Sequence, residues 1–174
     1  VVREREPGGI HAARTDRHGI GGEERIVTLN EEVELLRNIP LFAKIDPPKL
    51  KLLAFASERM FFAAGQELFH YGDHGDMAYI IIEGKAEVII DTPTGDIVVA
   101  KVGTNDIVGE IAILCDVPRT ATVQATEKMT TLAISKDLFF QMVCEYPQMA
   151  IEIMRELAHR LENSNVLLRT MKAE

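Results

Sequence analysis

The first regular pattern of apolar positions along the chain begins near residue 30 and has the spacing of a helix. Val33, Leu36 and Ile39 recur every three positions, which would place them on one face of an amphipathic helix. Asn30 precedes this pattern and is expected to cap the helix, because its side chain can accept a hydrogen bond from a free amide of the first turn. Pro40 is expected to end the helix.

A second helix is predicted a few residues later. Asp46 is followed by two prolines and then by Leu50 and Leu53, the order expected of an acidic cap, an early proline and an apolar face. Residues 1–29, by contrast, are rich in Arg, Glu, Gly and His and contain few large apolar side chains. We therefore expect a flexible leader over residues 1–29 and one folded domain over residues 30–174.

From residue 59 to about residue 135 the pattern changes to short β-branched runs separated by glycine-containing turns, which is typical of strands. The candidate strands are Met60–Ala63, Glu67–Tyr71, Ala78–Ile82, Glu87–Ile90, Ile97–Lys101, Ala121–Ala125 and Thr131–Ile134. No predicted helix alternates with them, which disfavours a parallel α/β sheet. The expected fold is mainly β with flanking helices: an antiparallel, jelly-roll-like β-roll with N-terminal helices and a long C-terminal helix.

The C-terminal region returns to helical spacing. A short helix is predicted over residues 135–147, and a long one from residue 148 to about residue 171. The long helix carries a stripe whose members are four and three residues apart, namely Ala150, Met154, Leu157, Leu161, Ser164, Leu168 and Met171. This stripe can pack on the β-roll or form a homodimer with a second copy, and the spacing is compatible with both.

Charge and composition narrow the classes of partner. The chain of 174 residues has a net charge of −8 and no block of lysines and arginines, so contact with nucleic acid is not expected. The longest apolar runs, such as residues 78–82, are too short to span a bilayer, and no secretory signal pattern is visible. Cys115 and Cys144 lack metal or redox spacing, so we expect reduced thiols in a cytoplasmic protein.

The candidate chemistry lies in the run V-G-E-I-A-I-L-C-D-V-P-R-T-A-T-V, residues 108–123. A turn that opens after Gly109 leaves amide donors, for instance that of Ala112, free to point at an anion. The guanidinium of Arg119 can bind two phosphate oxygens at once, and the carboxylate of Glu110 can accept a hydrogen bond from a sugar hydroxyl. Together these groups suit a cyclic phosphodiester on a ribose.

This run resembles the phosphate-binding cassette of the cyclic nucleotide-binding domain family, which reads roughly F-G-E-L-A-L, a short variable stretch, P-R, a small residue and A-T. Val108 replaces the usual aromatic residue, and Ile111 and Ile113 replace leucines. The resemblance implies a sensor without catalysis, in which Arg119 neutralises the phosphate and Glu110 reads the ribose 2′-hydroxyl. The cassette residues that it implies as ligand-binding are Gly109, Glu110, Ile111, Ala112, Arg119, Thr120 and Ala121.

The same resemblance implies cyclic AMP as the ligand, with cyclic GMP as the alternative, and it implies no cofactor. A threonine after the cassette arginine often accompanies cyclic GMP in the family, so Thr120 leaves the base open. The stretch from Glu145 to Asn165 is similar to the long helix of the bacterial catabolite activators in this family. That similarity implies a dimer seam along the helix, with Ser164 and Asn165 reaching the base.

Other interpretations of these residues stay open at this point. Glu110 and Arg119 could simply pair with each other in a turn, and the domain could be a ligand-free dimerisation or docking module. It could also be a regulatory fragment of a larger channel, kinase or transcription factor, with an unknown effector. His70 and His74 could be offered as metal ligands, but the His-X-His pair and following glutamate of cupin-like enzymes are absent, so neither a metal nor an enzyme is expected.

Overall fold

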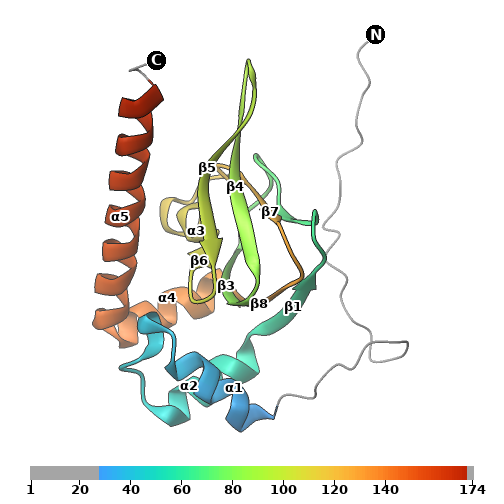
Figure 1. Ribbon diagram of the computed structural model, residues 1–174. Helices are drawn as coiled ribbons and strands as arrows, with labels where there is room; N and C mark the ends of the chain where they lie inside the picture. Colours follow the sequence, from blue (N-terminus) through green and yellow to red (C-terminus); the bar gives the residue numbers. More distant parts are fainter. Residues whose placement is uncertain (1–27, 172–174) are drawn as a thin grey trace.

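A computed structural model of the protein describes residues 28–171 (Figure 1). Helices and strands occupy the positions that the apolar pattern predicts, with differences at several ends. The helical elements are α1 (Leu29–Arg37), the 3-10 turn η1 (Pro40–Phe42), α2 (Pro47–Ala56), α3 (Glu110–Cys115), α4 (Lys136–Glu145) and α5 (Pro147–Met171). The strands are β1 (Glu58–Phe62), β2 (Glu67–Phe69), β3 (Met77–Glu83), β4 (Lys85–Thr92), β5 (Gly95–Gly103), β6 (Ile107–Val108), β7 (Thr122–Ala125) and β8 (Met129–Ser135).

Within residues 28–171 the strands form two four-stranded sheets, ordered β1-β8-β3-β6 and β2-β7-β4-β5, in which every pairing is antiparallel. The predicted antiparallel β-roll with flanking helices is therefore confirmed. α1 and α2 lie at one end of the roll, the β4–β5 hairpin projects at the other, and α5 stands beside β5 and α3 (Figure 1).

The two central strands of the sheet β1-β8-β3-β6, β8 and β3, are buried on both faces, and their residues alternate between two cores. On β8, Met129 and Ala133 belong to the core inside the roll, whereas Leu132 and Ile134 belong to the core under the helices. This alternation follows from the period of two along a strand. The helical core gathers side chains of α1, α2, α4 and α5, so the roll and its helices form one packed unit.

The start of α1 differs from the prediction. Thr28, and not Asn30, caps the helix: its hydroxyl accepts from the amide of Glu31, and the Glu31 carboxylate accepts from the amide of Thr28. This reciprocal pair is a capping box, which the order T-L-N-E already contains. α1 also ends at Arg37, and Pro40 opens η1 instead of stopping the helix.

Several other element ends also differ from the prediction. The predicted leader lies outside the described residues except for its last two positions, and these belong to the cap and first residue of α1. Asp46 does stand at the cap position of α2, but its side chain makes no capping hydrogen bond. β4 and β5 are longer than predicted, and β6, which has two residues, is too short to show a period in sequence.

Helix α5 divides its apolar stripe between the roll and the solvent. Met149 and Ile153 are buried in the helical core, and Leu157 packs partly against it. Met154 and Leu161 are 59% and 63% exposed, and Leu168 is similarly exposed at 58%. Met149 and Ile153 lie beside the predicted stripe and do not belong to it. Of the stripe itself, Leu157 packs partly on the protein's own core, whereas Met154, Leu161 and Leu168 face outward.

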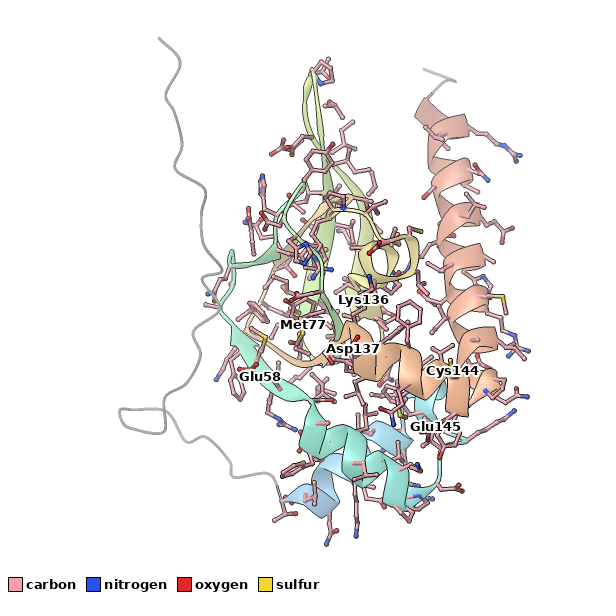
Figure 2. The ribbon with its side chains drawn as sticks, turned by 180° about the vertical axis from the view of Figure 1, so that it is seen from behind. Glu58, Met77, Lys136, Asp137, Cys144 and Glu145 are labelled. Carbon is pink, nitrogen blue, oxygen red and sulfur yellow. The ribbon has the colours of Figure 1, made fainter. Side chains whose placement is uncertain are left out.

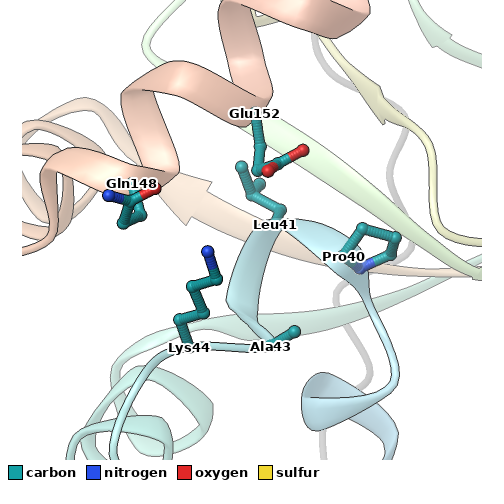
Figure 3. A pocket seen from close by; sticks show the side chains of 6 residues that line it. All are labelled: Pro40, Leu41, Ala43, Lys44, Gln148 and Glu152. Atoms are coloured by element: carbon teal, nitrogen blue, oxygen red, sulfur yellow. The ribbon is translucent and has the colours of Figure 1, made fainter.

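A shallow pocket of about 210 Å³ lies between η1 and the start of α5 (Figure 3). Its lining residues are Pro40, Leu41, Ala43, Lys44, Gln148 and Glu152, none of which belongs to the cassette. Among the helices of residues 28–171, none has the length and apolar character that crossing a membrane requires.

Candidate functional site

Gly109 begins the cassette in a conformation that a side chain would disturb. Its φ of 82° is in the left-handed region, which glycine adopts without strain. A Cβ at this position would lie 2.6 Å from Nη1 of Arg119 and 3.1 Å from the carbonyl oxygen of Met77. The glycine therefore lets the guanidinium approach the backbone at the start of α3.

Arg119 points inward and is only 3% exposed. Its Nη1 donates to the carbonyl of Gly109 at 2.9 Å, and its Nη2 donates to the carbonyl of Met77 at 2.8 Å. Met77 is the first residue of β3, and its strand partner Ser135 precedes Lys136 of α4 (Figure 2). The ring of Phe69 lies under the guanidinium, with its centroid 4.2 Å from Cζ. Two carbonyls and one aromatic face thus fix the plane of the guanidinium.

The charge of Arg119 is not neutralised by the contacts that hold it. No carboxylate among residues 28–171 forms an ion pair with it, and its Nε is buried without a hydrogen-bond partner. Burial lowers the pKa of the guanidinium, while Tyr79, Asp76, Asp73 and Glu110 nearby act in the opposite direction. An arginine stays charged under these conditions, so the site contains a fixed positive charge whose Nε makes no hydrogen bond.

The loop between β2 and β3 packs on the backbone of Arg119. The amide of Gly72 donates to the Arg119 carbonyl at 2.8 Å, and the Arg119 amide donates to the carbonyl of Asp73 at 2.9 Å. A Cβ on Gly75 would lie 2.5 Å from Cβ of Ala112 and 3.2 Å from Nε of Arg119. Only a residue without a side chain fits at this contact, so Gly75 brings the loop against the cassette.

Glu110 is the second buried charge of the site and is 1% exposed. Its Oε1 accepts from Nη1 of Arg160, on α5, at 2.9 Å, whereas its Oε2 is buried without a partner. Burial raises the pKa of the Glu110 carboxyl, and the charge of Arg160 offsets part of that rise. Arg160 also donates to the carbonyl of Ile107 and pairs with Glu156, so one side chain joins α5 to both sides of Gly109.

The remaining predicted residues of the cassette surround these two charges. Ala112 is buried, Ala121 is half-buried, and Ile111 and Thr120 are exposed. Ala112, whose amide is the predicted donor, is the third residue of α3. This helix covers six residues, 110–115, whereas the expected apolar turn covers residues 111–114.

The two residues predicted on the long helix lie one turn beyond Arg160. Ser164 is half-buried and, four positions after Arg160, shares its side of α5. Asn165 is exposed. Neither side chain makes a hydrogen bond to another residue within the part of the chain that the structure describes, so the structure brings the cassette residues together but not these two.

Two alternative interpretations can be compared with this geometry. Glu110 and Arg119 do not pair with each other, because Arg160 and the two carbonyls take those places. His70 contacts Glu67 and Thr122 through Nδ1. In the described region, no group of three or more His, Cys, Asp or Glu side chains is arranged to hold a metal ion.

Reasoning from sequence missed Phe69, Met77, Gly75 and Arg160. Met77 contributes through its backbone, which leaves no trace in residue type. Phe69 and Gly75 lie about 40 to 50 positions before Arg119, and only the strand pairing brings them to it. Arg160 could have been noticed, since it precedes the predicted Ser164 by one helical turn.

The arrangement offers a fixed positive charge with a free donor and, close by in the chain, a buried carboxylate with a free acceptor. A phosphate matches the first group and a hydroxyl matches the second. Because both atoms are already buried, their interactions with a ligand would be made in a low dielectric, where they are strong. The residues present therefore fit a sugar phosphate held at two points.

Comparisons with known proteins agree with this chemistry. Residues 59–146, about half of the chain, match the family model described as "Cyclic nucleotide-binding domain". The chain is 26% identical over 133 residues to a CRP-like cAMP-activated global transcriptional regulator of Mycobacterium tuberculosis, covering 76% of this chain and 59% of that protein. The chain thus spans less than two thirds of the length of this relative.

Two solved structures are similar in fold. The N-terminal domain of a transcriptional regulator from Streptomyces coelicolor is 34% identical, with a TM-score of 0.57, and the match covers 75% of this chain and 94% of that one. The catabolite activator protein of Thermus thermophilus is 25% identical, with a TM-score of 0.65, over 76% of this chain and 63% of that one.

The contact between Arg160 and Glu110 leads to a prediction about stability. Arg160→Ala should lower the free energy of unfolding by roughly 2–3 kcal/mol, because it leaves a buried carboxylate unpaired. This is below the range for fully buried pairs, since Arg160 is 22% exposed. Urea denaturation measures the change. The double variant Arg160→Ala with Glu110→Gln should recover part of the loss, because it removes the unpaired charge.

The matched control is Arg155→Ala on the same helix, whose side chain is 65% exposed and pairs with Glu152. It should change the free energy of unfolding by less than about 0.5 kcal/mol. Equal effects of the two alanine substitutions would show that the Arg160 contact does not hold α5 to the cassette.

Proposed function

The chain belongs to the cyclic nucleotide-binding domain family, and from this premise we propose that its cassette binds cyclic AMP reversibly and acts as a sensor. The domain itself carries out no catalysis in this proposal. Cyclic GMP is the alternative ligand. The proposal needs a site that recognises both a cyclic phosphate and a ribose, and it needs an element whose position depends on occupancy.

A single observation carries the proposal: of the three buried side-chain polar atoms without partners among residues 28–171, the two that belong to charged groups both lie in the cassette, one a donor on a cation and one an acceptor on an anion. They are Nε of Arg119 and Oε2 of Glu110. A buried polar group without a hydrogen bond costs about 1–3 kcal/mol, so such groups are rare unless a ligand satisfies them. A cyclic nucleotide supplies an anionic oxygen for the first atom and a ribose 2′-hydroxyl for the second.

We assign the individual roles as follows. Arg119 binds the phosphate, and the amides of Ala112 and Ala121 complete the phosphate cradle. Glu110 accepts from the 2′-hydroxyl of the ribose. Gly109 and Ile111 form the wall of the site on the side of α3. Gly109 lets this backbone lie close to Arg119, because a Cβ there would collide with the guanidinium.

The base is assigned to the outer part of the site. Ser164 and Asn165 carry groups that can bond an exocyclic amine or a ring nitrogen, and Ser164 lies on the Arg160 side of α5. The exposed Thr120 can contact the phosphate or a guanine. We favour cyclic AMP because the Mycobacterium tuberculosis relative is named as cAMP-activated.

Arg160 offers a route from occupancy to the position of α5. It holds the same carboxylate that we assign to the ribose, so a ligand on Glu110 changes the surroundings of the Arg160 contact. A ligand shifts a conformational equilibrium only by binding one state better than another. We propose that α5 is the element whose position differs between the two states.

We further propose that the domain is a regulatory unit of a larger protein and not a ligand-free docking module. A ligand-free docking module is disfavoured, because such a module has no use for two buried atoms without partners. The catabolite activator of Thermus thermophilus is matched over 63% of its chain, which is consistent with a regulatory unit inside a larger protein. We propose no contact of this domain with nucleic acid, and its effector is a further protein region or partner.

We also propose that α5 pairs with α5 of a second copy. The outward residues Met154, Leu161 and Leu168 are seven positions apart and form one exposed apolar line. Large apolar side chains in a row on a helix are usually covered by another protein surface. Ser164 would then face a polar group of the partner helix or the ligand.

The assignment of Arg119 is tested by calorimetric titration of nucleotide-free protein with cyclic AMP and then cyclic GMP. Arg119→Ala should weaken binding by about 30-fold to several-thousand-fold, the range for losing one charged hydrogen-bonding partner. Arg119→Lys should recover only part of the affinity, because lysine lacks the planar fork. Arg155→Ala is the control of equal charge change, and affinity that survives Arg119→Ala would refute the phosphate assignment.

The assignment of Glu110 is tested with an analogue. Wild-type protein should bind 2′-deoxy cyclic AMP more weakly than cyclic AMP, and Glu110→Gln should bind cyclic AMP more weakly than wild type does. The two losses should not add, because both remove the same contact. Should the analogue lose as much affinity in Glu110→Gln as in wild type, Glu110 does not read the ribose.

The dimer is tested with Met154→Glu and Leu161→Glu together. Leu157 is left unchanged, because it packs partly on the protein's own core. Sedimentation velocity should show a wild-type dimer and a monomeric double variant, since two charges would be buried at the seam. Leu52→Glu is the control, as Leu52 on α2 is 59% exposed. A double variant that stays dimeric would place the interface elsewhere.

A further inference from the structure

Phe69 lies against the face of the Arg119 guanidinium and is the nearer of two aromatic rings beside it. The guanidinium carbon is 4.2 Å from the centroid of Phe69 and 5.8 Å from that of Tyr79. The two rings stack on each other, with centroids 5.8 Å apart and planes 30° apart. The cation therefore rests on a two-ring platform that belongs to the roll interior.

We propose that Phe69 is a positioning residue for the anion, holding the charged Arg119 guanidinium in its orientation through the face of its ring. This inference rests on the proposed function, since it concerns how Arg119 is presented to a phosphate. In this proposal Phe69 acts on the guanidinium, which it contacts, and not on the ligand.

The chemistry of the platform explains why an aromatic residue suits this place. A carboxylate under Arg119 would hold it equally well but would neutralise the charge that a phosphate needs. The negative face of an aromatic ring attracts a cation within about 6 Å without cancelling its charge. With carbonyls on the edge and a ring on the face, Nε is left as the one guanidinium nitrogen that makes no hydrogen bond.

The backbone around Phe69 is arranged for this contact. Phe69 ends the short strand β2 and pairs with Val123, and the register of β2 on β7 is irregular just before it. A Cβ on Gly109 would lie 3.3 Å from Cε1 of Phe69, so the ring also fills the space beside the start of α3. One side chain thus contacts the cation and occupies the space that a side chain at position 109 would need.

The molecule offers a matched control for this inference. Phe62 on β1 also contacts Tyr79, edge to face, with centroids 6.5 Å apart, and it is 2% exposed. It makes no recorded contact with Arg119. Phe62→Leu and Phe69→Leu therefore remove the same ring from the same core, and only the second removes the ring under the guanidinium.

The experiment measures affinity for cyclic AMP and the urea midpoint of wild type and both variants. Phe69→Leu should weaken binding about 5- to 30-fold, the range for a cation–π contact in a desolvated site. Phe62→Leu should change affinity less than about twofold while lowering the urea midpoint at least as much. Equal affinities of wild type and Phe69→Leu would overturn the proposal.

Replacing Phe69 with a trifluorinated phenylalanine separates charge from shape. Fluorine keeps the size of the ring nearly constant and weakens its negative face, so the affinity should fall toward that of Phe69→Leu. Full affinity with the fluorinated ring would show that Phe69 only fills space, which overturns the proposal.

A measurement without nucleotide keeps the test independent of the proposed function. In a double-mutant cycle, Phe69→Leu should lower the urea midpoint of wild type more than it lowers that of Arg119→Ala, because the ring has then lost its cation. Additive midpoints would overturn the platform. Wild-type protein that binds neither cyclic nucleotide would instead refute the proposed function, and the cycle would still decide the role of Phe69.

Discussion

The structure depends on burying the positive charge of Arg119 without neutralising it. A buried ion ordinarily requires an opposite charge, and here two backbone carbonyls and an aromatic face take that part. Each supporting feature follows from this requirement. Gly109 has no side chain, so that the guanidinium can reach the carbonyls. Gly75 has none either, so that the β2–β3 loop can lie against Ala112 and Arg119.

The two-sheet architecture supplies these supports from distant parts of the chain. β3 provides the carbonyl of Met77 and the ring of Tyr79, and β2 provides Phe69. Gly109 caps α3, which provides Glu110, and α5 contributes Arg160. Among the described residues, α5 is joined to the site through Arg160 and to the rest of the domain through its packing on the helical core. The movement that we propose for α5 therefore depends on one side chain for its link to the site.

Sequence reasoning grouped the residues that are neighbours in the chain: Gly109, Glu110 and Arg119 stand within eleven positions, and the anion site that their order predicts stays a prediction. It failed where partners meet only through strand pairing, as Phe69 does, or contribute a carbonyl, as Met77 does. The cap of α1 was a different error. The sequence contains the capping box from Thr28 to Glu31, but Asn30 stands nearer to the apolar face and is the cap that the apolar pattern predicts.

The alternation of β8 between two cores also limits how the gene can change in length. Inserting or deleting one codon within β8 would turn the residues on one side of the change to the opposite face, so that Leu132 and Ile134, for example, would leave the helical core for the roll interior. Neither core could be repaired by a second substitution nearby. Natural variation in chain length among relatives should therefore gather in the exposed hairpin turn between β4 and β5, and should spare the strand on which both cores depend.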